Sequence, residues 1–191
     1  MLKDLVLKNR SYRGYDHSVQ IPEKDLLELV DLTRYVASSI NHQVLKYKIV
    51  TDKELVSKIQ EQTVWAKALP EIRLPYKGTE PVAFVVICID HNLTRADVVY
   101  LRDVGAVAQT MLLGAVEKGF GGIMIGSFSK TNVKQILDLP DNLEPNLVVA
   151  FGKPDEEIVL TDCKDGKTIY YRSPDGKTHY VPKRPLDEIV V

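Results

Sequence analysis

The stretch of sequence that decides the fold is residues 94–128, TRADVVYLRDVGAVAQTMLLGAVEKGFGGIMIGSF. Thr94 and Asp97 form a Thr-x-x-Asp capping signal, and Lys118–Gly119 supply a basic last turn and a glycine stop. The apolar residues between these ends fall on every side of a helical wheel: Val104, Ala106, Val107, Ala108, Met111, Leu112, Leu113, Ala115 and Val116. The pattern predicts one long helix, residues 94–118, that is buried all round and leads into a glycine-rich turn and a short strand.

This helix also bears on the oligomeric state. A chain of 191 residues rarely has enough surface of its own to cover so long a helix on every side. We therefore expect a second copy of the chain to cover part of it, which makes the protein a homodimer. Small residues would let two such helices approach closely: Gly105, Ala106, Ala108, Gly114 and Ala115. The alternative is the central helix of a monomeric α/β domain.

The composition excludes several classes of partner. With 25 basic and 26 acidic residues and a net charge of −1, the chain lacks the excess of positive charge that is typical of nucleic-acid-binding proteins. Its longest apolar run, residues 82–89, is far shorter than the ~20 residues of a membrane span, and residues 1–4 begin no signal peptide. The two cysteines and four histidines show no metal-ligand spacing. We expect a cytoplasmic protein of one domain, residues 1–191, without nucleic-acid, membrane or metal partners.

Periodicity places the other elements around the long helix. We expect helices at 2–9, 22–36, 52–62 and 130–138 and strands at 44–50, 82–89, 123–125 and 147–151. The strand at 82–89 is continuously apolar and should be central, whereas lysines alternate through 44–50 and predict a position near the sheet edge.

Three segments have no clear place in this sheet. Residues 64–80 lack any period and form either a lid or binding loop, or a segment that Trp65 and Tyr76 pin to the core. Residues 155–182 are polar, with Asp-Gly turn signals that predict hairpin-like excursions on the surface. The tail after Pro182 alternates apolar residues and could add an edge strand.

Polar motifs mark candidate binding sites. Arg10-Ser11-x-Arg13 combines two guanidinium groups and a hydroxyl, which suit a phosphate, although the arginines could equally pair with surface carboxylates. The loop Ser38-Ser39-x-Asn41-x-Gln43 could bind a planar ligand with a heteroatom edge, or could be a plain polar turn. Gly126–Ser127 ends a strand and lets bare backbone approach a ligand. Lys183–Arg184 is a basic pair of the kind that is usually solvated.

Four of these motifs, in this order, resemble the FMN-dependent nitroreductase family. They are Arg10-Ser11-x-Arg13, Ser38-Ser39-x-Asn41-x-Gln43, Gly121-Gly122-x-x-x-Gly126-Ser127-Phe128 and Lys183-Arg184-Pro185-Leu186-Asp187-Glu188. The resemblance implies an α+β fold with a central mixed sheet flanked by helices, and a homodimer joined through the long central helix. It also implies one FMN per subunit, bound at the interface by both chains.

The resemblance further implies which residues bind the flavin. The cofactor-binding set is Arg10, Ser11, Arg13, Ser38, Ser39, Asn41, Gln43, Ile125, Gly126, Ser127, Lys183 and Arg184. Within it, the two ends of the chain hold the phosphate, with Arg13 either at the phosphate or under the N1–C2=O edge of the flavin ring. The loop at 38–43 reaches the flavin of the partner subunit, and the backbone at 125–127 faces flavin N5 and O4. The family commonly has arginine where Asn9 stands and proline where Ala37 stands, so the phosphate clamp has one charge fewer and the loop turn is looser.

The implied activity is a ping-pong oxidoreduction, in which NADH or NADPH gives a hydride to the flavin and a nitroaromatic, quinone or activated enone then accepts the electrons. No catalytic side chain is assigned, because the flavin performs the chemistry. One alternative keeps the flavin but changes the reaction to reductive dehalogenation or oxidative flavin cleavage, with a lid at 64–80. Another is a dimeric interaction protein without flavin, in which the arginines form only surface ion pairs.

Overall fold

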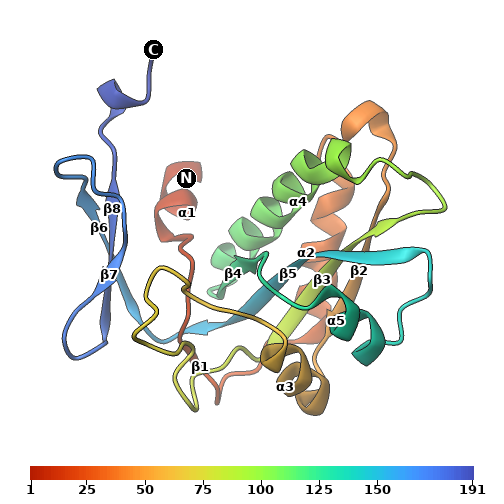
Figure 1. Cartoon of the computed structure of the whole chain (residues 1–191), viewed down its shortest axis with the longest axis horizontal. Coiled ribbons are helices and arrows are strands. Elements are labelled where there is room, and N and C mark those ends of the chain that lie inside the picture. The colour runs from red at the N-terminus through yellow and green to blue at the C-terminus, as the bar shows by residue number, and fades with distance from the viewer.

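The computed structural model describes residues 1–191 and contains two separate sheets (Figure 1). The elements are α1 (Leu2–Lys8), β1 (Tyr15–Asp16), α2 (Glu23–Leu32), β2 (Leu45–Val50), α3 (Lys53–Glu61), β3 (Ala83–Asp90), α4 (Asp97–Glu117), β4 (Gly121–Ile125), α5 (Lys130–Ile136), β5 (Leu143–Pro154), β6 (Glu157–Asp162), β7 (Tyr171–Arg172) and β8 (Thr178–Lys183), with 3-10 turns at Thr33–Tyr35, Ser39–Asn41 and Leu186–Glu188. No helix has both the length and the apolar character that a membrane crossing needs.

The larger sheet has five strands in the order β1-β5-β3-β2, with β4 also paired to β5. All its strand pairs are antiparallel, and the isolated Ser11–Gly122 bridge is the parallel contact, so the sheet is mixed only at that point. Every residue of β3 is buried, as its continuous apolar run predicts. On β2 the lysines at 46 and 48 are exposed, and the strand lies at the sheet edge as expected.

Helices cover both faces of this sheet (Figure 1). On one face, α2 and α4 pack against alternate residues of β3 such as Val85 and Ile87. On the other face, α3 and α5 pack against the intervening residues, Phe84 and Val86. Successive side chains of a strand point to opposite faces, so a strand that is apolar throughout fills both cores at once. The α+β architecture predicted from the sequence is therefore the one observed.

The long central helix differs from its prediction in two respects. It begins at Asp97 and not at Thr94, because the Thr94 hydroxyl accepts a hydrogen bond from the backbone N–H of Ala96 in the preceding turn. It is also not buried all round by its own chain. One face stays exposed, which we name the exposed stripe of α4: Val98, Val99, Leu101, Arg102, Gly105, Ala106 and Gln109. Its spacing of three and four residues is that of one helix face.

The second sheet is made by β6, β8 and β7 and lies beside α1 (Figure 1). The β7–β8 hairpin turns at Asp175–Gly176 as predicted, but β6 pairs with β8 in parallel. This region is not a set of surface excursions, because a Glu156–Arg172 ion pair and the His179 ring are buried in it. After β8 the chain forms a short 3-10 turn and no further edge strand, since Leu186, Ile189 and Val190 are all exposed.

Candidate functional site

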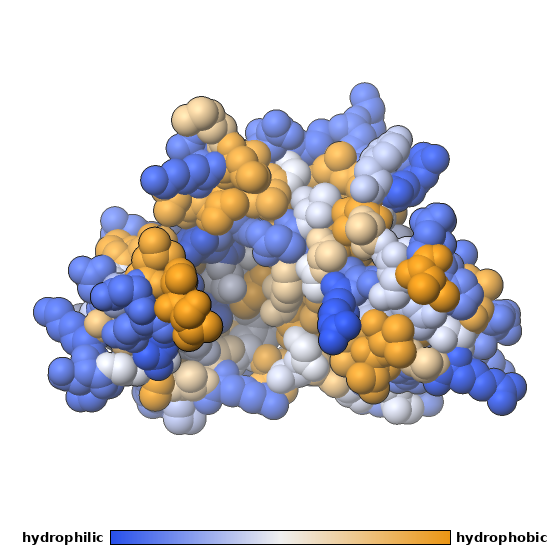
Figure 2. Space-filling view, turned by 90° about the horizontal axis from the view of Figure 1, so that it is seen from above, coloured by the Kyte–Doolittle hydropathy of each residue, from blue (hydrophilic) through white to orange (hydrophobic).

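The two ends of the chain meet at a cavity of about 340 Å³, which we name the basic cavity. Arg10, Ser11 and Arg13 come to it from the N-terminal end, and Lys183 comes from the end of β8. The remaining lining residues are Asn9, Gln109, Leu112, Gly122, Met124, Ile158, Tyr170, His179 and Val181. No carboxylate lines it, so its electrostatics favour an anion. Seen from above, the surface is hollowed between the C-terminal side and the bulk of the larger sheet (Figure 2).

Local backbone structure explains why the N-terminal motif reaches this place. α1 ends at Lys8, the following Asn9 has an extended backbone, and the chain then runs beside β4. The backbone N–H of Tyr12 donates to the carbonyl of Gly122 at 3.2 Å, and Ser11 bridges to the same residue. A Cβ on Gly122 would lie 2.1 Å from the Ala150 carbonyl oxygen, so only glycine fits where these segments cross. The motif is thereby fixed against the rigid sheet.

The arginines of the basic cavity have hydrogen-bond donors to spare. Arg10 Nη2 donates to the Val6 carbonyl at 2.7 Å, which leaves its buried Nε without a partner. Arg13 is 8% exposed, and its buried Nε also lacks a partner. Burial lowers the pKa of Arg13, with Tyr170 and Glu156 acting in the opposite direction. Buried donors without partners are uncommon in folded proteins, so two cationic ones at one cavity indicate an acceptor from outside the chain.

A second cavity of about 170 Å³, which we name the glycine cavity, shares Arg13 and Met124 with the first. The β4 turn forms one wall through Ile125, Gly126 and Ser127, and residues 64–67 form the other. The two walls are joined, because the N–H of Val64 donates to the Ser127 carbonyl at 2.8 Å. The predicted backbone turn and three of the predicted cations, Arg10, Arg13 and Lys183, therefore lie at adjoining cavities.

Gly126 differs from most glycines of the chain in what surrounds it. A Cβ added there would meet no atom within 4 Å, and its φ is not positive. Gly105, on the exposed stripe of α4, is alike in both respects. Neither glycine is required by its own backbone or by packing within this chain. Something outside the chain, a ligand at Gly126 and a second molecule at Gly105, would explain why these positions have no side chain.

Five of the predicted site residues line neither cavity. The loop at 38–43 lies against α4, where the Ser39 N–H and hydroxyl donate to the buried Asp103 carboxylate at 2.8 and 2.9 Å. Its Asn41 and Gln43, and Ile40 between the predicted residues, have positive φ, a strained conformation for side-chain-bearing residues. The other predicted residue outside is Arg184, which is exposed and pairs with Glu188 at 2.8 Å. The basic pair thus divides, and only Lys183 lines the basic cavity.

Several lining residues escaped the sequence analysis. Gln109 looked like a polar interruption of an apolar helix, and Tyr170 and His179 looked like parts of surface hairpins. Trp65, Ala66 and Lys67 belong to the segment that had no period. Of these residues, only Ala66 has an unusual backbone conformation, with a positive φ of 47°. No sequence pattern predicts that conformation for an alanine. Their functional position follows from tertiary contacts alone.

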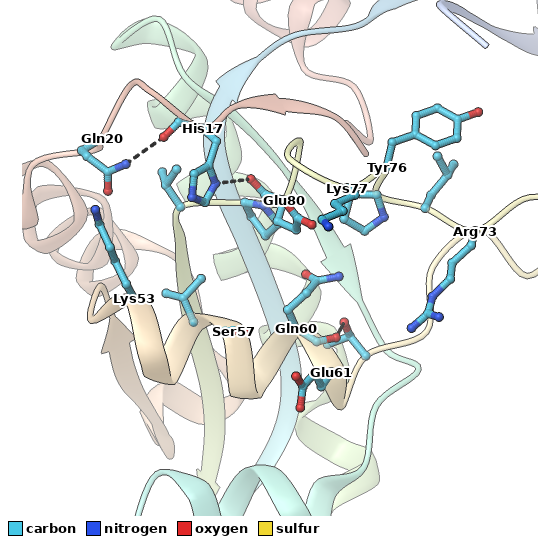
Figure 3. Close-up of a pocket in the computed structure, with 16 residues that line it drawn as sticks. His17, Gln20, Lys53, Ser57, Gln60, Glu61, Arg73, Tyr76, Lys77 and Glu80 are labelled. Atoms are coloured by element: carbon cyan, nitrogen blue, oxygen red, sulfur yellow. Dashed lines mark hydrogen bonds between the residues drawn. The ribbon is translucent and has the colours of Figure 1, made fainter. Parts of the chain in front are cut away.

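A larger cavity of about 640 Å³ lies elsewhere, between α3 and residues 73–82 (Figure 3). None of the predicted site residues lines it. Both walls carry ionisable side chains: Lys53 and Glu61 on α3, and His17, Arg73, Lys77 and Glu80 opposite them. The later part of the segment 64–80, residues 73–77 and Glu80, lines this cavity, whereas its first four residues, 64–67, line the glycine cavity.

Comparison with known proteins identifies the relatives of this arrangement. The model of the nitroreductase family matches residues 6–153, most of the chain. The chain belongs to the nitroreductase family. This confirms the resemblance stated from the four motifs, and with it the assignment of the chain as an enzyme of the nitroreductase type.

Individual relatives of this nitroreductase family member have low sequence identity but align over most of the chain. An Archaeoglobus fulgidus protein provisionally named NADH dehydrogenase/NAD(P)H nitroreductase is 24% identical over 166 residues, which cover 84% of this chain and 90% of that protein. The NADPH-flavin oxidoreductase of Vibrio harveyi is 28% identical over 167 residues, 80% of this chain and 65% of that protein. A solved Staphylococcus epidermidis structure, provisionally named an NAD(P)H:FMN oxidoreductase, has a TM-score of 0.71 at 17% identity and covers 100% of this chain and 95% of its own.

Proposed function

We propose that this chain is an FMN-dependent oxidoreductase that uses NADH or NADPH to reduce nitroaromatic, quinone or enone acceptors by a ping-pong reaction. The observation that supports this most is the junction of the basic cavity with the glycine cavity at Arg13 and Met124. A flavin mononucleotide has an anionic phosphate at one end and a planar ring with heteroatoms at the other. The chain offers cations at one cavity and unobstructed backbone at the next.

The residues present fit such a group. Arg10 and Lys183 would bind the phosphate, which has about two negative charges near neutral pH. Ser11 would supply a hydroxyl, and Arg13 would face the ring. The turn at 125–127 would offer backbone N–H groups to the ring heteroatoms. When bound, the flavin would accept a hydride and pass electrons to the second substrate, so the protein's part is to bind the cofactor, orient it and leave one face open.

The names of the relatives agree with this chemistry. The Vibrio harveyi protein is an NADPH-flavin oxidoreductase, and the Staphylococcus epidermidis structure is provisionally an NAD(P)H:FMN oxidoreductase. They support FMN as the cofactor and a reduced nicotinamide as the electron donor. The acceptor, the cytoplasmic location and the organisation of residues 1–191 as one domain stay predictions.

The homodimer is part of the same proposal. The exposed stripe of α4 is mostly apolar, and Gly105 at its middle has open space around it, which permits close helix approach. The loop at 38–43 is fixed to the same helix through Asp103, so a partner seated on α4 would also meet this loop. Such an arrangement would let Ser38, Ser39, Asn41 and Gln43 act on the partner's flavin, although they line no cavity of their own chain.

The dimer can be tested at the open glycine. Gly105→Arg should reduce the solution mass from two chains to one, because a long charged side chain cannot be buried between two close helices. Glu117→Arg is the matched control, since that residue is exposed at the C-terminal end of the same helix. A dimer that persists in the Gly105 variant, with the same dissociation constant as the control, would exclude α4 as the interface.

The catalytic proposal is tested by the visible spectrum. Adding FMN to the purified protein should give a bound-flavin spectrum at one flavin per chain. Anaerobic NADH or NADPH should bleach it, and nitroaromatics, quinones or enones should restore it. Reoxidation by halogenated phenols alone would favour the dehalogenase alternative. A protein that gains no flavin spectrum, or whose flavin neither nicotinamide bleaches, would contradict the proposal.

One structural observation separates the two flavin alternatives. A dehalogenating or flavin-cleaving relative would need a lid or catalytic insert over the flavin. Only residues 64–67 of the segment 64–80 reach the glycine cavity, and they are joined to the opposite wall by the Val64–Ser127 hydrogen bond. The proposed reductase, which needs an open flavin face, fits this arrangement better.

A further inference from the structure

The guanidinium of Arg13 is held by the second sheet as well as by its own loop. Its Nη1 donates to the Ser11 carbonyl at 3.0 Å and to the Nε2 atom of His179 at 3.3 Å. Its central carbon lies 4.8 Å from the centre of the Tyr170 ring, a cation–π distance. The Tyr170 and His179 rings are themselves 5.0 Å apart. Two aromatic side chains of the C-terminal region therefore fix the direction of one cation of the basic cavity.

The His179 ring is neutral in this place. It is 1% exposed, and burial, followed by the charges of Arg13 and Arg172, lowers its pKa to about 4. Because a guanidinium can only donate, Nε2 of His179 must accept, and the ring proton must therefore be on Nδ1. Nδ1 is buried and has no partner. The buried ring therefore makes a single hydrogen bond, to Arg13.

No carboxylate accepts a hydrogen bond from the guanidinium of Arg13. Glu156 is the nearest candidate, but its carboxylate pairs with Arg172 and accepts the backbone N–H of Arg13, not its guanidinium. A carboxylate at the position of His179 would form a bidentate pair with Arg13 and neutralise it. A neutral imidazole orients the guanidinium and leaves its charge and its buried Nε donor for an outside acceptor.

We propose that His179 is a positioning residue, which together with Tyr170 aims the guanidinium of Arg13 at the bound flavin ring without pairing it with a carboxylate. This inference rests on the proposed function. A full positive charge held against the ring favours the reduced flavin, which is anionic when it has lost its N1 proton. His179 should therefore raise both the affinity for FMN and the reduction potential of the bound flavin through its hydrogen bond to Arg13.

Three substitutions separate this role from a merely structural one. His179→Gln keeps a neutral acceptor, His179→Leu removes the acceptor, and His179→Glu adds a compensating charge. We expect the Gln variant to bind FMN within about twofold of wild type, and the Leu variant to bind roughly tenfold more weakly, the size of one charge-assisted hydrogen bond. The Glu variant should show the lowest flavin reduction potential of the three. His17→Gln, a histidine remote from both cavities, is the control.

The outcomes distinguish this inference from the proposed function. If wild type binds no FMN, both fail. If wild type binds FMN and the Leu and Glu variants match it in affinity and reduction potential, the inference alone is wrong. Should the Leu or Glu variant not fold, Tyr170→Leu removes the other aromatic contact of Arg13 and should also lower the reduction potential of the bound flavin. In the flavin-free protein, ring NMR should show His179 neutral with its proton on Nδ1 at pH 6, and a protonated ring there would overturn the inference.

Discussion

The five-stranded sheet and the three-stranded sheet are stabilised in different ways. In the larger sheet, β3 is buried along its whole length by apolar side chains of four helices and its neighbouring strands. The smaller sheet has few buried residues, and those nearest the site are polar: Glu156 and Arg172 form an ion pair with 4% and 7% exposure of their side chains, and His179 lies beside them. Apolar burial needs no particular partner, whereas a buried charge needs one at a defined place.

This difference places rigidity and specificity in separate regions. The larger sheet supports the β4 turn and the N-terminal motif through backbone bonds to β4 and β5. The smaller sheet contributes the side chains that direct Arg13 and close the basic cavity. Damage to the smaller sheet should therefore affect flavin binding as well as stability.

The largest effect should come from the buried ion pair. Glu156→Gln leaves Arg172 buried without a countercharge, and we expect the free energy of unfolding to fall by about 3 kcal/mol. Denaturant titration of the flavin-free protein measures this. The neighbouring Glu157→Gln is the matched control, because Glu157 is exposed and only accepts from Thr178 at 3.0 Å. Its effect should stay within about 0.5 kcal/mol. Equal effects of the two variants would show that the smaller sheet does not depend on its buried charges.

The next effect depends on pH. The folded-state pKa of His179 is about 4, below that of an unfolded histidine, so between these values only the unfolded chain binds the proton. Stability should fall as the pH drops from about 6.5 to about 4, by as much as about 3 kcal/mol in total. His179→Gln removes this titrating group. As the pH drops from about 6.5 to about 4, the unfolding free energy of the variant should therefore rise relative to that of wild type. A constant difference between the two proteins from pH 7 to pH 4 would contradict a neutral buried ring.

The same contrast explains how much the sequence could predict. The elements of the larger sheet follow from periodicity, caps and glycine stops, because apolar pattern and burial are directly linked there. The N-terminal and C-terminal motifs and the β4 turn could be named as site residues from the resemblance, and seven of them line the two cavities. His179 and Tyr170 could not, because a lone histidine or tyrosine in a polar hairpin has no local signal. The partners of Arg184 and of the expected α4 cap Thr94 are the Glu188 carboxylate and the Ala96 backbone N–H, and residue spacing does not fix either of them.

A smaller effect should follow from filling the open space at the β4 turn. Gly126→Leu adds a side chain where this chain has no atom within 4 Å of a Cβ, so the flavin-free protein should lose less than about 1 kcal/mol of stability. FMN affinity should nevertheless fall at least roughly tenfold, because the side chain would occupy the ligand's place. Gly166→Ala, at a turn remote from both cavities, should leave the affinity unchanged. If the Gly126 variant bound FMN with wild-type affinity, the turn at 125–127 would not be part of the FMN site.

The smallest effect lies at the far end of the larger sheet. There His91 stands between two carboxylates, with Nε2 3.2 Å from Glu144 and Nδ1 3.6 Å from Asp97. The hydrogen bond to Glu144, assisted by Thr94 and Asp97, raises the pKa of His91. Its contribution is therefore complete below about pH 6.5 and lost as the pH rises through the folded-state pKa, the opposite sense to His179. For this partly exposed group we expect less than about 1 kcal/mol, measured as the loss of that pH dependence in His91→Gln.

On the proposed function, cations from both ends of the chain bind one FMN phosphate in the basic cavity. Fluorescence titration of FMN into wild type, Arg10→Ala/Lys183→Ala and Arg184→Ala tests it most directly, because Arg184 is a neighbouring cation that lies outside the cavity. We predict that the double variant binds FMN at least about a hundredfold more weakly, the equivalent of two charge-assisted contacts. The Arg184 variant should bind within about threefold of wild type. Unchanged affinity in the double variant would contradict the account.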